Sequence, residues 1–291
     1  MIIVKLSGGL GNQMFQYASG RSLASRLQVE LKLDVTGYTD GSLRRYELHN
    51  LNIKEHFATD AEIAALKTGD RTFLGRIIDK ICNRWLPDPP GFFREENFHF
   101  DPRLLQLPDG SYLDGYWQSE KYFAEIAETI RVEFRVTKPL AGRNKELSEQ
   151  ILASNAVSVH IRRGDYVAKP ATAAYHGACD RNYYLRCFDA VCRTVANPVF
   201  FVFSDEPDWV KCEFSLPTPM TVVDVNSAEQ AHEDMRLMSQ CKSHIIANSS
   251  FSWWGGWLAN DPGKNVFSPR RWFADDSIDT SDLIPEGWVR I

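Results

Sequence analysis

The chain has 291 residues, of which 44% are hydrophobic and 24% are charged, and its formal net charge at pH 7 is −5. These values are typical of a globular protein with room for two domains, and the acidic balance disfavours a generic nucleic-acid binder. Any basic site must therefore be local, so two adjacent arginines are more informative here than they would be in a basic protein.

The cysteines and the apolar segments bear on the cellular compartment. None of the six cysteines forms a CxxC pair and no His/Cys spacing suits zinc, so we expect reduced thiols in a cytosolic protein. The amino-terminal run MIIVKLSGG is too short for a signal peptide, and no window of about 18 apolar residues predicts a membrane span. The sequence therefore predicts a cytoplasmic protein without a transmembrane segment.

The start of the chain predicts a βαβ unit. IIVKL is typical of a buried strand, SGGLGN of a loop, and VELKLDV of a second strand that ends at Asp34. Between the two strands, apolar residues recur with helical spacing over residues 13–27, although Gly20 interrupts the stripe. This order of elements is typical of an α/β domain.

The next part of the chain carries fewer strand signals. SYLDGYWQS predicts a strand that leads toward a site, and PDPPG at 87–91 predicts a rigid loop. Helical periodicity is found over three ranges: 60–85 with a break near Gly69, 119–134 and 144–153. The segment KPLAGRNK then interrupts the pattern, and we place the end of a first α/β domain at residue 150.

The second half of the chain repeats the βα rhythm more clearly. Four apolar strands, AVSVHI, PVFFVFS, MTVVDV and HIIAN, alternate with helices at 181–196, at 227–241 and from SSFSWWGGWLA onward. Apolar runs of this kind predict a parallel sheet that is covered on both faces. We assign residues 151–275 to a second, Rossmann-like domain and leave 276–291 as a tail of unknown packing.

Polar loops follow several of the predicted strands. HIRRGD, SDEPD and NSSFS come after strands of the second domain, and SGGLGNQ comes after the first strand of the chain. In open parallel sheets, ligands bind beyond the carboxyl ends of the strands. We therefore expect two parallel sheets that face a central cleft, with a ligand held between the domains.

The glycine loop SGGLGNQ leaves two functional interpretations open. Glycines here let the backbone approach a phosphate at the start of a helix. Gly9 and Gly11 fit the dinucleotide fingerprint GxGxxG, and Asp34 lies where a ribose carboxylate would be, but Met14 occupies the third glycine position. An NAD(P)-dependent oxidoreductase is thus one competing hypothesis, and a tight turn without a ligand is another.

The motif HIRRGDY predicts an anion site. Arginine pairs bidentately with phosphate, and adjacent side chains of an extended segment point to opposite sides. We expect one of Arg162 and Arg163 to bind the ligand and the other to pair with a carboxylate such as Asp165. Two surface charges without a ligand are the alternative.

Two further motifs carry polar residues past strand ends. In FVFSDEPDW, the carboxylate of Asp205 suits a guanine edge or a ribose hydroxyl, but Ser204 or Asp205 could equally cap a short helix. The helix start in ANSSFSWWGGW offers hydroxyls, an amide and backbone N–H groups to a diphosphate. The residues concerned are Asn248, Ser249, Ser250 and Ser252. We expect the tryptophans of this motif to be buried in the core between the two domains.

Some expected motifs are absent from the sequence. There is no Asp-x-Asp triplet, which many sugar-nucleotide enzymes use to hold a divalent metal on the diphosphate. The arginines could replace that charge, so we expect no metal site and no cofactor. The sequence also lacks GxSxG, the P-loop and HExxH, so hydrolase, kinase and zincin hypotheses have no support.

Taken in order, the motifs resemble those of a known family. GGLGNQMFQYA, HIRRGDY, FSDEPDW and SSFSWWGGWL extend from residue 8 to residue 258. The set resembles the bacterial inverting α-1,2-fucosyltransferases, of the glycosyltransferase family 11 type. The arginine-pair motif is shared with α-1,6- and protein O-fucosyltransferases, whereas the first and last motifs narrow the resemblance.

The resemblance implies a GT-B-like fold of two Rossmann-like domains, with GDP-β-L-fucose bound mainly by the second. It implies that Arg162 grips the β-phosphate and that His160 and Asp205 approach the guanosine. It places Asn12, in the glycine loop with Gly11, across the cleft from the same diphosphate. The hydroxyls near that diphosphate would be those of Ser249, Ser250 and Ser252.

The implied reaction is inverting transfer of L-fucose to the 2-hydroxyl of a galactose, without a metal. The expected acceptor is a galactose-terminated surface glycan of the lipopolysaccharide or capsule type, lipid-linked acceptors included. This would place the enzyme in the cytoplasm, free or peripheral at the inner membrane. Another GDP-sugar transferase, a non-catalytic sugar-binding protein and, last, the oxidoreductase stay as alternatives.

The general base is left open among several carboxylates. Asp165 lies next to the arginine pair, whereas others lie in segments of the first domain that could face the acceptor. These are Asp34, Asp114 and one of Glu95 and Glu96.

Overall fold

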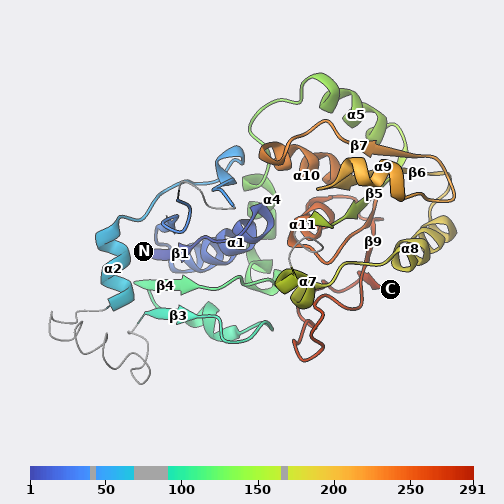
Figure 1. Cartoon of the computed structure of the whole chain (residues 1–291). Helices are drawn as coiled ribbons and strands as arrows, with labels where there is room; N and C mark the ends of the chain where they lie inside the picture. Colours follow the sequence, from blue (N-terminus) through green and yellow to red (C-terminus); the bar gives the residue numbers. More distant parts are fainter. Residues whose placement is uncertain (40–43, 69–90, 165–169) are drawn as a thin grey trace. The chain divides into compact units, whose positions relative to one another are not determined.

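The computed structural model describes residues 1–39, 44–68, 91–164 and 170–291. Within these ranges the chain forms two compact units, shown in Figure 1. The N-terminal unit comprises Met1–His49 and Ile53–Glu133, and the C-terminal unit comprises Asn50–Asn52 and Phe134–Ile291. Three predicted features fall wholly or partly outside the described residues: the second part of the 60–85 helix, most of the 87–91 loop, and Asp165.

The N-terminal unit is built on a four-stranded parallel sheet with the strand order β2-β1-β4-β3. Its strands are β1 (Ile2–Lys5), β2 (Leu31–Asp34), β3 (Phe92–Arg94) and β4 (Ser111–Asp114). Its α-helices are α1 (Leu10–Leu27), α2 (Asp60–Thr68) and α4 (Ala127–Glu133). Short 3-10 turns are η1 (Leu48–Asn50, which reaches the second unit), η2 (Pro102–Gln106), η3 (Glu120–Tyr122) and η4 (Ala124–Ile126). Strand β3 was not predicted.

The strand β1 forms the centre of this unit because its residues are apolar on both faces. Ile2, Ile3 and Val4 are fully buried, and β1 pairs with β2 on one side and β4 on the other. Gly20 has a packing role in α1, since a Cβ there would lie 2.9 Å from the Leu31 side chain. The glycine that interrupts the helical pattern thus lets α1 lie close against the sheet.

The C-terminal unit is built on a six-stranded parallel sheet with the order β10-β9-β8-β5-β6-β7. Its strands are β5 (Asn155–Ile161), β6 (Pro198–Ser204), β7 (Met220–Val223), β8 (Ser243–Ile245), β9 (Asn265–Ser268) and β10 (Val289–Arg290). Its helices are α5 (Gly142–Leu152), α7 (Pro170–His176), α8 (Arg181–Thr194), α9 (Pro207–Glu213), the turn η5 (Ala228–Gln230), α10 (Ala231–Ser239) and α11 (Ser250–Leu258). The four predicted strands are confirmed, and two were missed: β9 and β10.

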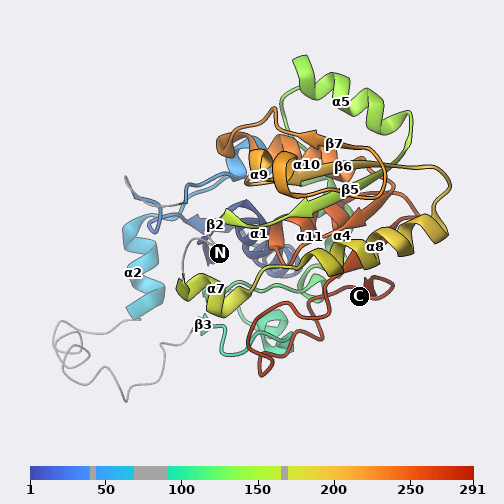
Figure 2. The same cartoon turned by 45° about the vertical axis from the view of Figure 1, so that its right-hand side comes forward.

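The apolar strand β6 explains how both faces of this sheet are covered. Phe200 and Val202 point to a core that α8 and α9 complete, whereas Phe201 and Phe203 point to a core with α5 and α10. Figure 2 shows α5 and α8 on opposite sides of β5 and β6. The sheet is therefore covered on both faces, as the apolar runs predicted.

The structure moves two predicted boundaries. Helix α5 lies in the C-terminal unit and not before a limit at residue 150, because Leu147 and Ile151 pack in the same core as Phe201. The predicted tail 276–291 is part of the same unit. Its strand β10 pairs with β9, and the ring centroids of Trp288 and Trp253 are 5.4 Å apart.

The tryptophans of the last motif pack with one another inside the C-terminal unit. Trp253 and Trp254 are fully buried, and the Trp253 Nε1–H donates to the Leu283 carbonyl at 2.8 Å. Trp254 packs edge-on against Trp257, with ring centroids 5.2 Å apart. These side chains therefore stabilise the core beneath the start of α11.

Both units are α/β folds with wholly parallel sheets, which confirms the predicted fold class of two Rossmann-like domains. Over the described ranges, no helix combines the length and the apolar character that a membrane crossing requires. The five cysteines in those ranges are all free.

Candidate functional site

Strands β5 and β6 bring the arginine motif and the SDEPD motif together. The two strands run in parallel with Ile161 opposite Ser204, so the residues that follow them leave the sheet side by side. Arg162 Nη1 lies 2.9 Å from Asp205 Oδ2, and these side chains are 17% and 22% exposed. The carboxyl edge of the C-terminal sheet thus carries a partly sheltered ion pair.

The Asp205 carboxylate is held on both of its oxygens. Its Oδ1 accepts a hydrogen bond from the Arg163 backbone N–H at 3.0 Å, while Oδ2 faces Arg162. A Cβ at Gly164 would lie 2.4 Å from Oδ2, so only glycine fits there without a shift. Asp205 is therefore not the cap of α9, whose N-cap residue is Glu206.

Arg163 contacts a different set of groups. Its Nε lies 3.2 Å from Glu206 Oε2, and its guanidinium lies 3.6 Å from the centre of the Trp209 ring. Adjacent arginines thus have separate carboxylate partners, both in the loop that follows β6. The partner of Arg163 in the described chain is Glu206, whereas Asp165, predicted for this role, lies outside it.

His160 lies inside the unit, near the end of β5. The side chain is 3% exposed, and its ring centre lies 5.4 Å from that of Phe251. Burial, together with the charge of Arg162, lowers the pKa of His160 to about 3, so the imidazole is neutral at physiological pH. Its Nδ1 has no hydrogen-bond partner among the described residues. The expected contact with guanosine stays a prediction for a side chain that is buried here.

Asn248 connects separate loops through hydrogen bonds to their backbone. Its Nδ2 donates to the carbonyls of His176, Gly177 and Trp272 at 2.9 to 3.0 Å, and its Oδ1 accepts a contact from Cys179 Sγ at 3.5 Å. Asn248 is only 3% exposed, and these contacts occupy its side-chain amide. It therefore positions the loops around the start of α11. The predicted direct contact of Asn248 with the donor therefore requires these hydrogen bonds to change.

The three serines of the SSFS segment differ in accessibility. Ser249 is the N-cap of α11 and accepts from the Phe251 backbone N–H at 3.3 Å. Ser252 is fully buried and donates to the carbonyl of Ala247 at 3.4 Å. Ser250 is partly exposed, so it is the serine of this set that a ligand can reach most directly.

The glycine loop of the N-terminal unit is shorter than predicted. Helix α1 starts at Leu10 with Gly9 as its N-cap, so Gly11 and Asn12 lie in the first turn of the helix. Gly8 has φ of +78°, and a Cβ there would lie 2.6 Å from Asn12 Nδ2. The Asn12 Oδ1 accepts a hydrogen bond from Gln118 Nε2 at 2.9 Å.

Two buried glutamines hold this loop, and the sequence reading had missed both. Gln13 Nε2 donates to the carbonyls of Gly8 and Arg45 at 3.0 and 2.7 Å. Gln16 Nε2 donates to Ser7 Oγ and to the Gly115 carbonyl, both at 3.0 Å. The sequence offered one signal for their role: Gln13 and Gln16 are amides on a helix whose neighbouring residues are apolar or small.

The acidic residues of the N-terminal unit separate into two kinds. Asp34 is 1% exposed and contacts the Lys67 ammonium at 3.1 Å, and Asp114 contacts Lys5 at 3.0 Å. Glu95 instead accepts hydrogen bonds from the backbone N–H groups of Tyr116 and Trp117 at 2.7 and 3.0 Å. Glu95 thus differs from the two aspartates in having no cationic partner in the described part of the chain.

Over the described ranges, no group of three or more His, Cys, Asp or Glu residues is arranged to hold a metal ion.

Comparison with known proteins identifies the family. The model of Glycosyl transferase family 11 matches residues 95–291. An Escherichia coli protein named alpha-1,2-colitosyltransferase is 37% identical, with 100% of this chain and 99% of that protein covered. The Escherichia coli O-antigen biosynthesis glycosyltransferase WbnK is 32% identical over 98% of this chain and 99% of its own length. A Caenorhabditis elegans galactoside 2-alpha-L-fucosyltransferase is 27% identical over 65% of this chain and 56% of its own length.

Two parallel-sheet units and these matches define a sugar-transferring enzyme. The chain belongs to glycosyltransferase family 11. The resemblance found in the motifs is thereby confirmed at the level of the family, which leaves the oxidoreductase and the non-catalytic sugar-binding protein without support.

Proposed function

We propose that this glycosyltransferase moves L-fucose from GDP-β-L-fucose to the 2-hydroxyl of a galactose residue, with inversion at the anomeric carbon. The product would be an α-1,2 linkage in a surface glycan. The Arg162–Asp205 pair at the end of β5 and β6 is the observation that carries the proposal, because it offers a fixed, partly exposed guanidinium to a diphosphate. The names of the relatives add the α-1,2 linkage and the galactoside acceptor.

In this mechanism, Arg162 stabilises the charge that develops on the leaving GDP. A guanidinium has five N–H donors, so it can contact a carboxylate and a phosphate at the same time. Asp205 fixes its orientation, and fixed donors aimed at developing charge typically contribute a few kcal/mol to the transition state. We therefore assign Asp205 to the positioning of Arg162, and its contact with guanosine stays a prediction.

We further propose that Ser250 and the start of α11 approach the diphosphate, while Ser249 and Asn248 hold that helix start in place. A metal ion is not needed in this scheme, because arginine supplies the positive charge. The base that accepts the proton of the acceptor hydroxyl is not assigned, since Asp165 lies outside the described residues.

A second candidate is transfer of colitose, which differs from L-fucose by the loss of one hydroxyl. The whole-length match to the Escherichia coli alpha-1,2-colitosyltransferase favours it. Both candidates use a GDP-linked L-sugar at the same diphosphate site, so they differ only in the pocket for the sugar.

A thermal-shift series with GDP, GDP-fucose, NAD and lactose tests the donor class, because a ligand stabilises the state that binds it. We expect GDP and GDP-fucose to raise the melting temperature and NAD to leave it unchanged. A transfer assay with GDP-fucose and GDP-colitose in competition, with lactose as acceptor, then distinguishes the two sugars. Stabilisation by NAD without any response to GDP would contradict the proposal.

A further inference from the structure

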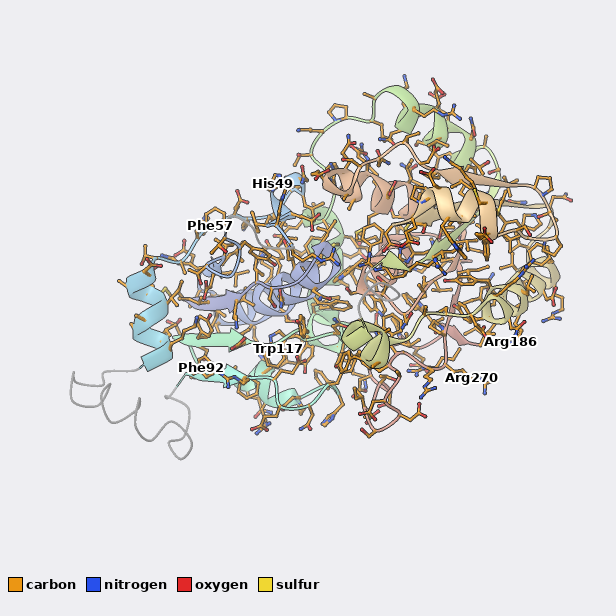
Figure 3. The ribbon with its side chains drawn as sticks, in the orientation of Figure 1. His49, Phe57, Phe92, Trp117, Arg186 and Arg270 are labelled. Carbon is orange, nitrogen blue, oxygen red and sulfur yellow. The ribbon has the colours of Figure 1, made fainter. Side chains whose placement is uncertain are left out.

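Helix α8 presents two adjacent tyrosines to the sheet of the C-terminal unit. Tyr183 and Tyr184 are each 3% exposed and belong to the core that α8 forms with β5 and β6. Figure 3 labels Arg186, an exposed residue on the outer side of the same helix. The hydroxyls of the two tyrosines point the other way and contact backbone carbonyls near the carboxyl ends of the strands.

The Tyr184 hydroxyl holds the last part of β5 in place. It donates a hydrogen bond to the His160 carbonyl at 3.1 Å. The pairing of β5 with β8 ends at Val159, whereas its pairing with β6 continues to Ile161. Tyr184 thus supplies a hydrogen bond just where one neighbouring strand has ended, and Arg162 follows directly after this part of β5.

The position of this hydroxyl is fixed by the packing of its ring. The Tyr184 ring packs edge-on against Phe214 and Tyr183, with centroids 5.4 and 5.1 Å apart. Burial, with a smaller contribution from the charge of Asp205, raises the pKa of Tyr184 well above its usual range. The hydroxyl therefore stays protonated at physiological pH and remains a hydrogen-bond donor to the His160 carbonyl.

The backbone that follows this hydrogen bond carries both contacts to Asp205. Arg162 Nη1 lies 2.9 Å from Asp205 Oδ2, and the Arg163 backbone N–H donates to Asp205 Oδ1 at 3.0 Å. A shift of the backbone at His160 would therefore move the guanidinium and the N–H together. Misplacement of a reacting or binding group by about 1 Å can lower a rate by about a hundredfold.

Tyr183 has the same chemistry but contacts different strands. Its hydroxyl lies 2.6 Å from the Ile246 carbonyl oxygen and 3.1 Å from that of Phe267. The backbone already joins these two residues, since the Ile246 N–H donates to the Phe267 carbonyl at 3.0 Å. Tyr183 therefore reinforces β8 and β9, and neither of these strands carries Arg162.

We propose that Tyr184 is a positioning residue of the diphosphate site, which acts through the His160 carbonyl to fix the backbone that presents Arg162. The inference rests on the proposed function, in which Arg162 binds the diphosphate of GDP. Tyr184 does not touch the ligand in this scheme, because it is buried beneath the strand. Its hydroxyl determines how accurately the guanidinium meets the charge that develops on the leaving group.

The test compares Tyr184→Phe with the matched control Tyr183→Phe in the full chain, with GDP as the probe. Each variant loses one buried hydroxyl from the same helix and keeps its ring, so we expect folded proteins whose melting temperatures fall by similar amounts. Tyr184→Phe should raise the Kd for GDP three- to tenfold in titration calorimetry. It should lower kcat for transfer from GDP-fucose at least tenfold, because the charge on the diphosphate is largest in the transition state. Tyr183→Phe should change both values less than twofold.

A double-mutant cycle shows whether Tyr184 acts through Arg162. In the Arg162→Ala background, Tyr184→Phe should raise the Kd for GDP by less than a further twofold, because the guanidinium that it positions is gone. Equal effects of the two tyrosine variants, an undiminished effect of Tyr184→Phe without Arg162, or a wild type that does not bind GDP would overturn the inference. GDP binding with the expected coupling, in a protein that transfers no fucose, would support the inference and contradict only the proposed sugar.

Discussion

The carboxyl edges of the two parallel sheets carry different chemistry. In the C-terminal unit, each of two arginines forms an ion pair with a carboxylate: Arg162 with Asp205 and Arg163 with Glu206. In the N-terminal unit, amides connect the strand ends, as in the hydrogen bond from Gln118 to Asn12, and Glu95 stays without a cation among the described residues.

We propose that this difference suits each edge to a different class of ligand. An ion pair at a strand end can exchange part of its carboxylate contact for a phosphate, which suits a nucleotide diphosphate. Amides, backbone N–H groups and an isolated carboxylate form directional hydrogen bonds with neutral hydroxyls, which suits a sugar acceptor. The predictions below test whether the two edges are separable in this way.

The largest effect is expected for Arg162→Ala. Removing the guanidinium takes away the charge that would stabilise the departing diphosphate, and we expect kcat to fall by about a thousandfold or more. The fold should persist, because Arg162 lies at a partly exposed edge and not in a core. Steady-state transfer assays and circular dichroism on the same preparation check this. Near-normal turnover in a folded variant would remove Arg162 from the mechanism.

A smaller effect is expected for Gly164→Ala. The new methyl group would approach Asp205 Oδ2 at 2.4 Å and displace the carboxylate that orients Arg162. We expect kcat to fall by about ten- to a hundredfold, because a misplaced charge loses part of its effect on the transition state. Gly263→Ala is the control, since its Cβ would find only Asp261 Oδ1 at 3.4 Å. Equal activity in the two variants would show that the position of Asp205 is not critical.

The partly buried carboxylate Asp234 allows a pH test within the C-terminal unit. Burial raises its pKa to about 7, and the nearby Glu233 adds to the shift, while Asn226 donates to it at 2.7 Å. The folded state therefore holds a proton that the unfolded chain releases near its ordinary pKa of 3.8. The contribution of Asp234 to stability then falls as the pH rises from about 4 to about 7, and is constant above that.

Asp234→Asn keeps an oxygen for Asn226 but removes the charge. We expect the free energy of unfolding to rise by about 1–2 kcal/mol at pH 8 and to change little at pH 4. Urea unfolding at the two pH values measures the difference. A variant that is destabilised equally at both would mean that the carboxylate contributes through its hydrogen bond alone.

Much of the fold could be predicted because buried parallel strands are encoded locally. Apolar runs such as PVFFVFS are recognisable without any knowledge of their neighbours, and they give β6 and its flanking helices. The strands β3 (FFR), β9 (NVFS) and β10 (VR) each contain at most two apolar residues, so they lack such a run and depend on pairing with strands distant in sequence.

The site residues were predictable as chemical types but not as partners. The sequence indicates that Arg162 needs an anion, yet only the register of β5 against β6 brings Asp205 to it. The turn that binds Glu95 was harder to predict, because it depends on a left-handed tryptophan, a conformation that no sequence preference favours. Asn248 shows the reverse case, since a residue typical of a ligand site is engaged with three backbone carbonyls.

The smallest effect is expected from removal of divalent metal. If the arginine edge alone supplies the positive charge at the diphosphate, then excess EDTA should change kcat less than twofold, and added manganese or magnesium should not raise it more than that. A metal-requiring site would instead need carboxylates free to face the diphosphate, and Asp205 is engaged with Arg162 and with the Arg163 N–H. The Arg162→Ala variant sharpens the measurement, because a latent metal site would restore its activity with millimolar manganese. Rescue of that kind, or a strict metal requirement in the wild type, would show that the two edges do not differ as proposed and that the diphosphate site recruits a cation.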